Sequence, residues 1–188
     1  MEQPASPGEV RADLVRALWL VAGAMAIHEL EEWNIAEWGA RNFSNHTGIS
    51  DQAIWVGLLF ITVVFVGWIF LATRLHNPLA ISLVALPPVG LVAIGNSMQH
   101  ITWTFLFGEY APGVVSALFL VLPTSILAIW RMLQVHRLLS LPLGFCAGLW
   151  VAGVVRTIEA GHEMQAFQVV LHRFCISLAE ALGLPGVG

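Results

Sequence analysis

Five stretches of the chain are apolar over enough residues to form membrane-spanning helices. One lies near the N-terminus, where the apolar segment 17–27 leads directly into a cluster of ionisable residues. The other four are longer apolar runs at residues 52–73, 79–107, 114–131 and 141–155. A transmembrane helix needs about 20 mostly apolar residues. The pattern therefore predicts an all-α fold, a polytopic membrane bundle with about five transmembrane helices.

Polar segments and prolines set the expected boundaries of these helices. Residues 1–11 contain two prolines and little apolar content, which predicts a disordered tail. Residues 12–188 are then a single integral membrane domain, whose first helix is expected over 12–38. Pro87 and Pro88 should kink the third helix, because proline lacks a backbone N–H and clashes with the preceding turn.

The last apolar stretch, residues 164–182, differs from the others in its polar content. It includes Gln168, His172, Arg173 and Glu180. This mixture favours an amphipathic helix at the membrane interface over a sixth transmembrane helix.

The composition supports a membrane protein and argues against nucleic-acid binding. Hydrophobic residues make up 57% of the chain and charged residues only 11%, against about 25% charged in a soluble domain. The chain has no lysine and no basic cluster, so a nucleic-acid partner is not expected. Cys146 and Cys175 lie in apolar surroundings outside any CxxC motif, which favours core positions over a disulfide.

Arginine placement predicts the orientation in the cell membrane. The loops on one side carry most of the arginines, whereas the other side has Arg41 together with Glu37, Asp51 and Glu109. Cytoplasmic loops are enriched in arginine and lysine. The N-terminus is therefore expected in the cytoplasm, and the arginine-rich side comprises Arg11, Arg16, Arg74, Arg131 and Arg137.

Three of the predicted helices run outward and carry similar groups of polar residues. Positions i, i+3 and i+4 share one face of a helix. Each group lies roughly 25 to 30 Å from the start of its helix, at 1.5 Å per residue. The groups are therefore expected to meet in the outer half of the membrane. They are His28, Glu31 and Glu32 in the first helix, Asn96, Gln99 and His100 in the third, and Glu159, His162 and Glu163 in the fifth.

The alternative is that "HELEEW" is only the polar end of the first helix, with Trp33 and Trp38 at the membrane interface. For that helix alone, the two interpretations are equally well supported. A charged side chain deep in a bilayer costs roughly 2.5 to 3.5 kcal/mol. Three such groups at one depth therefore favour a functional site.

Histidine and carboxylate side chains together suit a divalent metal ion such as Zn or Fe. Glu-x-x-His is also the spacing that di-iron bundle proteins use on a helix. The sequence thus predicts a set of metal ligands: His28, Glu31, Glu32, His100, Glu159 and His162.

Other residues near these groups are assigned to catalysis or to substrate binding. Glu32, Glu163 and Tyr110 are candidate catalytic residues. Helix packing is an alternative role for two of the substrate-binding candidates, Asn96 and Gln99. Neutralisation of Glu159 or Glu163 is an alternative role for Arg156, and aromatic packing is an alternative role for Trp103. The substrate-binding candidates are Asn96, Gln99, Trp103 and Arg156.

The first four predicted helices resemble the HXXEE domain family. The resemblance lies in His28-x-x-Glu31-Glu32, in the later His100, and in Tyr110-Ala111-Pro112-Gly113. These match the family's HxxEE motif, its second histidine and its YxPG motif in order and spacing. The resemblance implies a small membrane protein with a shared site, and it supplies no reaction.

Three functions are compatible with these residues. The first is a metal-dependent membrane enzyme, a hydrolase or an oxidoreductase, that acts on a lipid or isoprenoid-like substrate. The second is a metal-free isomerase or cyclase in which a buried glutamate acts as an acid. The third is a proton-coupled carrier or a binding protein without catalysis. Bound metal separates the first from the second, and a reaction product separates both from the third.

The predicted orientation can be tested by labelling single cysteines in intact cells. Ser44 lies in the loop after the first helix, and Ser140 lies before the fifth. A membrane-impermeant thiol reagent should label Ser44→Cys from outside, and Ser140→Cys only after the membrane is opened. Labelling of Ser140→Cys alone from outside would reverse the topology.

Overall fold

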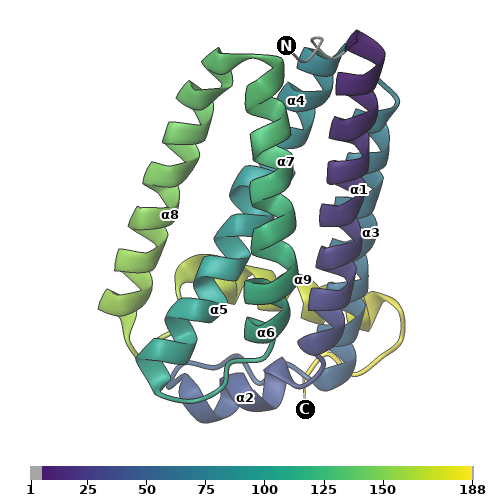
Figure 1. Cartoon of the computed structure of the whole chain (residues 1–188). Helices are drawn as coiled ribbons and strands as arrows, with labels where there is room; N and C mark the ends of the chain where they lie inside the picture. Colours follow the sequence, from purple (N-terminus) through teal and green to yellow (C-terminus); the bar gives the residue numbers. More distant parts are fainter. Residues whose placement is uncertain (1–5, 188) are drawn as a thin grey trace.

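The computed structural model describes residues 6–187, and these residues form a helical bundle without a β-strand. Five long helical segments lie side by side (Figure 1). Two of them, α1 and α3, are uninterrupted. The other three combine several shorter elements. The segments are α1 (Pro7–Glu31), α3 (Asp51–Thr73), α4 (Pro78–Leu86) with η1 (Pro87–Ala93) and α5 (Ile94–Phe107), α6 (Val114–Ser116) with η2 (Ala117–Val121) and α7 (Leu122–Val135), and η3 (Arg137–Leu139) with α8 (Ser140–Ala160).

Four of these segments are long and apolar enough to cross a membrane, which makes this a membrane protein. The remaining one, α1, is 25 residues long and carries charged residues, including Asp13, Arg16 and Glu29. Its apolar side packs against α3, α4 and α7, where Leu18 and Val21 are completely buried. The predicted all-α membrane bundle is confirmed.

The prolines in the interior of the third and fourth long segments are associated with π-helical turns. The segment η1 begins at Pro87 and Pro88, and η2 ends two residues before Pro123. Proline cannot donate a backbone hydrogen bond, and a π-helical turn changes the pairing to i→i+5. The expected interruption of the third helix is therefore present as a widened turn.

The first helix differs from its predicted boundaries at both ends. Residues 1–5 of the predicted tail lie outside the described residues, and α1 already begins at Pro7, where Ser6 and Glu9 form a capping box. The helix ends at Glu31 instead of at residue 38. A separate helix, α2 (Ile35–Asn42), then crosses the end of the bundle. This turn brings Trp38, only 2% exposed, into an aromatic cluster.

The C-terminal helix α9 (Ala166–Ala181) runs across the long helices instead of along them (Figure 1). One of its faces, with Cys175 and Ala179, is buried against α3. Its other face exposes Phe167 and Val170. These features agree with the predicted amphipathic helix, and α9 is not among the helices able to span a membrane.

Candidate functional site

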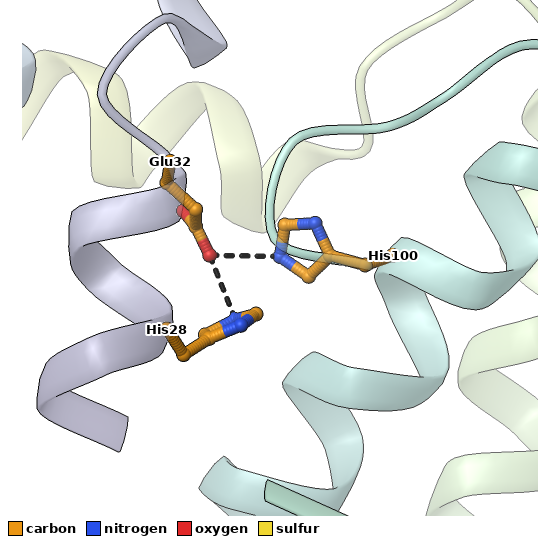
Figure 2. A group of neighbouring side chains, drawn as sticks. All are labelled: His28, Glu32 and His100. Carbon is orange, nitrogen blue, oxygen red and sulfur yellow. Dashed lines mark ion pairs between the residues drawn. The ribbon is translucent and has the colours of Figure 1, made fainter. Parts of the chain in front are cut away.

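Three buried side chains from two helices meet near the end of the bundle where α2 lies. His28 and Glu32 extend from the end of α1, and His100 extends from α5 (Figure 2). The Nε2 atoms of His28 and His100 lie 2.8 and 2.9 Å from Oε1 of Glu32. One ligand atom from each residue lies within 4.8 Å of the other two. We call these three residues the His28/Glu32/His100 triad.

The ring of His28 is oriented through its second nitrogen. Nδ1 lies 2.9 Å from the hydroxyl of Ser116, and this hydroxyl donates to the carbonyl of Gly113. The hydroxyl has one proton to donate, so its oxygen accepts the Nδ1–H of His28. Nε2 is then left with a lone pair, which lies 2.8 Å from Glu32 Oε1 and accepts a hydrogen bond from the side-chain amide of Asn96. Metal-binding histidines are commonly oriented by such a hydrogen bond on the opposite ring nitrogen.

The carboxylate of Glu32 is buried, and two imidazoles lie against its Oε1. Oε1 of Glu32 has no hydrogen-bond partner, although both imidazoles are close to it. The contacts are therefore short without being aligned as N–H···O bonds. Burying an ion costs several kcal/mol unless it is paired. A cation located between the three ligand atoms would supply this compensation.

The neighbouring Glu31 points to a different element. Its carboxylate accepts backbone N–H groups of Val115 and Ser116 at 3.1 and 2.7 Å, in the first turn of the segment that begins at Val114. The first N–H groups of a helix have no partner within it, and they favour a negative charge. Glu31 thus connects the end of α1 to the start of the fourth span.

Tyr110 completes this connection, because its hydroxyl donates to the Glu31 carboxylate. Burial, together with this hydrogen bond, raises the pKa of Tyr110 to about 12. The phenol is therefore protonated at neutral pH and serves as a donor to Glu31. It is not among the residues that line the cavity next to the triad.

Gly113, in the loop before α6, packs closely against the triad. Its φ of +91° is in the left-handed region. A Cβ at this position would lie 2.7 Å from Cε1 of His28, 3.1 Å from Nδ1 of His100 and 3.2 Å from Cγ of Glu32. Glycine is therefore required here both by the backbone conformation and by the close approach of the triad.

A cavity of about 430 Å³, which we call the chamber, extends from the triad into the apolar part of the bundle. Its polar end includes Glu32 and His100. The rest of the wall is mostly apolar and is built by α3, α5, α8 and α9. The residues that line the chamber also include three of the predicted substrate-binding residues: Asn96, Gln99 and Trp103.

These three residues have different contacts. The side-chain amide of Asn96 lies 2.8 Å from Nε2 of His28. Gln99 accepts a hydrogen bond from Thr157 of α8 at 3.0 Å. The ring of Trp103 packs edge-on against His100, with 5.1 Å between centroids. The structure therefore brings all three predicted residues close to the triad or to the chamber.

The predicted convergence of all three polar groups is wrong for the third group, which we call the α8 group: Glu159 lies in α8, and His162 and Glu163 lie in the turn after it. His162 is exposed, and its Nδ1 contacts the carbonyl of Asn42. Glu159 is exposed and pairs with Arg156 at 3.1 Å. Glu163 is exposed as well, and no residue of the α8 group belongs to the set of possible ligands within residues 6–187.

A layer of aromatic side chains separates the triad from the polar group that includes His162. Trp103 contacts His100, whereas Phe107, one turn further along α5, contacts His162 with 5.2 Å between centroids. Trp38 of α2 packs against both Trp103 and Phe107. The α8 group thus lies at the expected end of the bundle, but bulky side chains fill the space toward the triad.

Three residues of this site were not predicted from the sequence. Ser116 orients His28, and nothing in the local pattern indicates that role. Gly113 was identified only as the last residue of the motif Tyr110-Ala111-Pro112-Gly113. Glu29 is buried and lines the chamber. Its position three residues before Glu32 places both on one helix face, and this spacing was the signal that could have identified it.

The comparisons with known proteins agree with the location of the site. A family model described as "Protein of unknown function with HXXEE motif" matches residues 19–128, more than half of the chain. The matched region contains the triad, Gly113 and Ser116, whereas the α8 group lies outside it. No curated protein and no solved structure matches the chain.

The packing at Gly113 can be tested against a second glycine of similar conformation. Gly108 has a φ of +65°, but a Cβ there would meet no atom within 4 Å. Gly108→Ala should cost only the left-handed backbone penalty of about 1 to 2 kcal/mol. Gly113→Ala should cost about 1 to 3 kcal/mol more, from overpacking against the triad. Equal losses in the free energy of unfolding in detergent would contradict this packing.

Proposed function

The chain belongs to the HXXEE family, and we propose that it is an integral membrane enzyme with a divalent metal ion at the His28/Glu32/His100 triad. The observation that carries this proposal is the meeting of two imidazoles and one carboxylate, all buried, with ligand atoms within 4.8 Å of one another. Catalytic zinc sites use two histidines and a glutamate in this way. Non-haem iron sites use two histidines and one carboxylate.

Such a metal ion would activate water for hydrolysis or, if it is iron, bind dioxygen for oxidation. The chain's own residues prepare the site for it. Ser116 fixes the tautomer of His28, and the Glu32 carboxylate supplies one negative charge toward the ion. The side-chain amide of Asn96 donates to Nε2 of His28, and it would exchange this contact for one with a further ligand or the substrate when an ion is bound there.

The substrate of this enzyme is a lipid or another apolar molecule. The triad lies at one end of a mostly apolar chamber inside a membrane bundle. Ligand pockets are typically apolar with a few well-placed polar groups. We place this end of the bundle on the outer side of the cell membrane, because the arginine-rich loops lie at the other end.

A metal-free isomerase or cyclase is the second candidate, and Glu29 is the observation that favours it. This residue is a second buried carboxylate beside the same chamber. Two carboxylates in different environments can act as an acid and a base on one substrate. In that case an imidazolium at the triad, instead of a metal ion, would compensate Glu32.

Elemental analysis of gently purified protein separates these candidates. We expect about one Zn or Fe per chain, because the triad offers one set of three ligands. His28→Ala, Glu32→Gln and His100→Ala should each lower the metal content at least about tenfold, which corresponds to 1.4 kcal/mol. Protein that contains no metal, and takes up neither Zn nor Fe after purification without chelator, would favour the metal-free enzyme.

Neighbouring residues provide matched controls for this experiment. Glu31→Gln should keep the metal, because Glu31 binds the start of α6 and not the triad. His162→Ala should also keep it, since this histidine is exposed beyond the aromatic layer. Loss of metal from Glu31→Gln together with its retention in Glu32→Gln would exchange the roles of the two glutamates.

A further inference from the structure

The residues at the opening of the chamber differ from those inside it. The polar lining residues, which include Glu32 and Asn96, are all buried or half-buried. Every lining residue that is exposed is apolar. We call these exposed residues the rim: Leu91, Val92, Leu149, Phe167 and Leu171. An exposed apolar surface of this kind marks a site for a membrane or an apolar ligand, so the rim is suited to hydrocarbon and not to water.

The rim lies where the bilayer surrounds the protein. Its two residues from η1 are near the middle of the span Pro78–Phe107, and Leu149 is near the middle of the span Arg137–Ala160. The middle of a span lies near the centre of the bilayer. The other two rim residues belong to α9, which runs from the end of α8 to α3 (Figure 1). The opening therefore extends from the bilayer centre to the level of α9.

The end of the chamber at α2 is closed by bulky side chains. Trp38, Phe43 and Trp103 line this end, and each is at most 8% exposed. Met164, in the segment between α8 and α9, is buried beside them. A ligand that came from the water at this end would have to displace the packed cluster, whereas a ligand in the bilayer meets only the rim.

A lipid chain can pass the rim at little cost. Lipid tails are as apolar as a leucine side chain, so a chain that moves from the bilayer into the chamber exchanges one apolar environment for another. A water-soluble ligand would instead have to lose its hydration, which is costly for every polar group left without a partner. The wall therefore favours a ligand that is already dissolved in the membrane.

The volume of the chamber limits the size of this ligand. It is about 430 Å³, near the lower end of the roughly 300 to 1,000 Å³ that is typical of pockets for drug-sized ligands. A space of this size holds one hydrocarbon chain with a small head group. A phospholipid with two chains and a large polar head exceeds it.

The length of the chamber matches one leaflet of the bilayer. His100 at the triad and Leu91 at the rim are nine positions apart on one helical segment, which corresponds to roughly 13 Å at 1.5 Å per residue. The hydrocarbon core is about 30 Å thick, so one leaflet contributes about 15 Å. A chain whose head end lies at the triad therefore ends near the bilayer centre. It has the direction of a lipid in the leaflet at the α2 end.

We propose that the chamber takes up a single-chain lipid with a small head group, sideways through the rim, from the leaflet at the α2 end of the bundle. The head end lies at the triad, and the chain points to the bilayer centre. This inference rests on the proposed function, whose substrate class and entry route it specifies. Binding of the chain itself requires apolar contact and not the metal ion.

Photocrosslinking tests where the chain lies. The full-length protein in nanodiscs would be exposed to a monoacylglycerol with a diazirine either near the head group or at the chain end, and to a phosphatidylcholine with a diazirine near the head group. Three residues of α3 report the result. Ile54 is 5% exposed and lines the chamber, Ile69 is completely buried away from it, and Leu59 is exposed on the surface of the span.

Monoacylglycerol with the diazirine near its head group should label Ile54 and not Ile69, because only a chain inside the chamber reaches Ile54. The phosphatidylcholine should label Leu59 but neither buried residue. Labelling of Ile54 by the chain-end probe alone would mean the opposite direction of the chain. That result would overturn the inference, as would equal labelling of Ile54 and Ile69 by the monoacylglycerols.

A pair of glycines on α8 tests whether the labelling depends on the chamber. Gly153 lines the chamber and Gly148 is exposed outside it, and a Cβ at either position meets no atom within 4 Å. Gly153→Leu should lower the labelling of Ile54 several-fold, and Gly148→Leu should leave it unchanged. Labelling of Leu59 should persist in both variants, which shows that α3 is still in place. Equal effects on Ile54 would place the probe outside the chamber.

The entry route is tested with a spin label at Gly153→Cys, after replacement of Cys146 and Cys175 by alanine. Collisions with oxygen, which dissolves in the bilayer, should exceed collisions with a water-soluble nickel chelate. The reference positions are Val151→Cys on the exposed surface of α8 and Ser44→Cys in the exposed loop. A label at Gly153 that resembles Ser44 instead of Val151 would show entry from water and overturn the lateral route.

Metal content, measured in the same samples, distinguishes the two proposals. Protein that holds metal but shows no labelling of Ile54 would overturn this inference and leave the metal centre intact. Protein that is labelled at Ile54 without binding metal would overturn the metal centre, and would support the lipid as a ligand of the metal-free enzyme.

Discussion

A carboxylate that is removed from water must have its charge compensated by groups close to it, and this constraint acts on Glu32. Within the described residues, the imidazoles of His28 and His100 are the groups at its Oε1. His28 lies one turn earlier on α1, whereas His100 comes from α5. The triad therefore connects two helices that are distant in the sequence, and its buried position also explains why Gly113 must approach without a side chain.

The glutamates of "HELEE" have separate roles because each has a different direction on α1. Glu32 points to the imidazoles of the triad, and Glu31 points to the first turn of α6. Glu29, three residues before Glu32, lines the chamber but makes no contact with the imidazoles. Adjacent positions on an α-helix differ by about 100°, so one short motif supplies a helix connection, the carboxylate of the triad and a polar chamber wall.

The sequence predicted the helices well because each apolar run is long and its ends are marked by charged or turn-forming residues. It also placed His28, Glu32 and His100 in one site, since helices that run in the same direction bring equivalent depths together. It did not predict that His162 remains outside this site. Depth along a helix is readable from spacing, but lateral position depends on packing, here on the aromatic layer of Trp38, Trp103 and Phe107.

The end of α1 illustrates the same limit. A continuous helix to residue 38 was expected from composition, yet the chain turns after Glu31 and α2 crosses the bundle. Local preference did not decide this turn. Burial of Trp38 and the connection from Glu31 to α6 both require it, and these contacts come from residues more than 60 positions away in the chain.

The proposed metal centre can be tested directly by X-ray absorption spectroscopy of the protein after incubation with Zn. The spectrum should contain the multiple-scattering pattern of two imidazole rings together with oxygen ligands, and no sulfur. Replacement of His100 by alanine should reduce the pattern to that of one imidazole, or abolish binding. A site with one imidazole or none in the unaltered protein, or a site with sulfur ligands, would contradict a metal centre built from His28, Glu32 and His100.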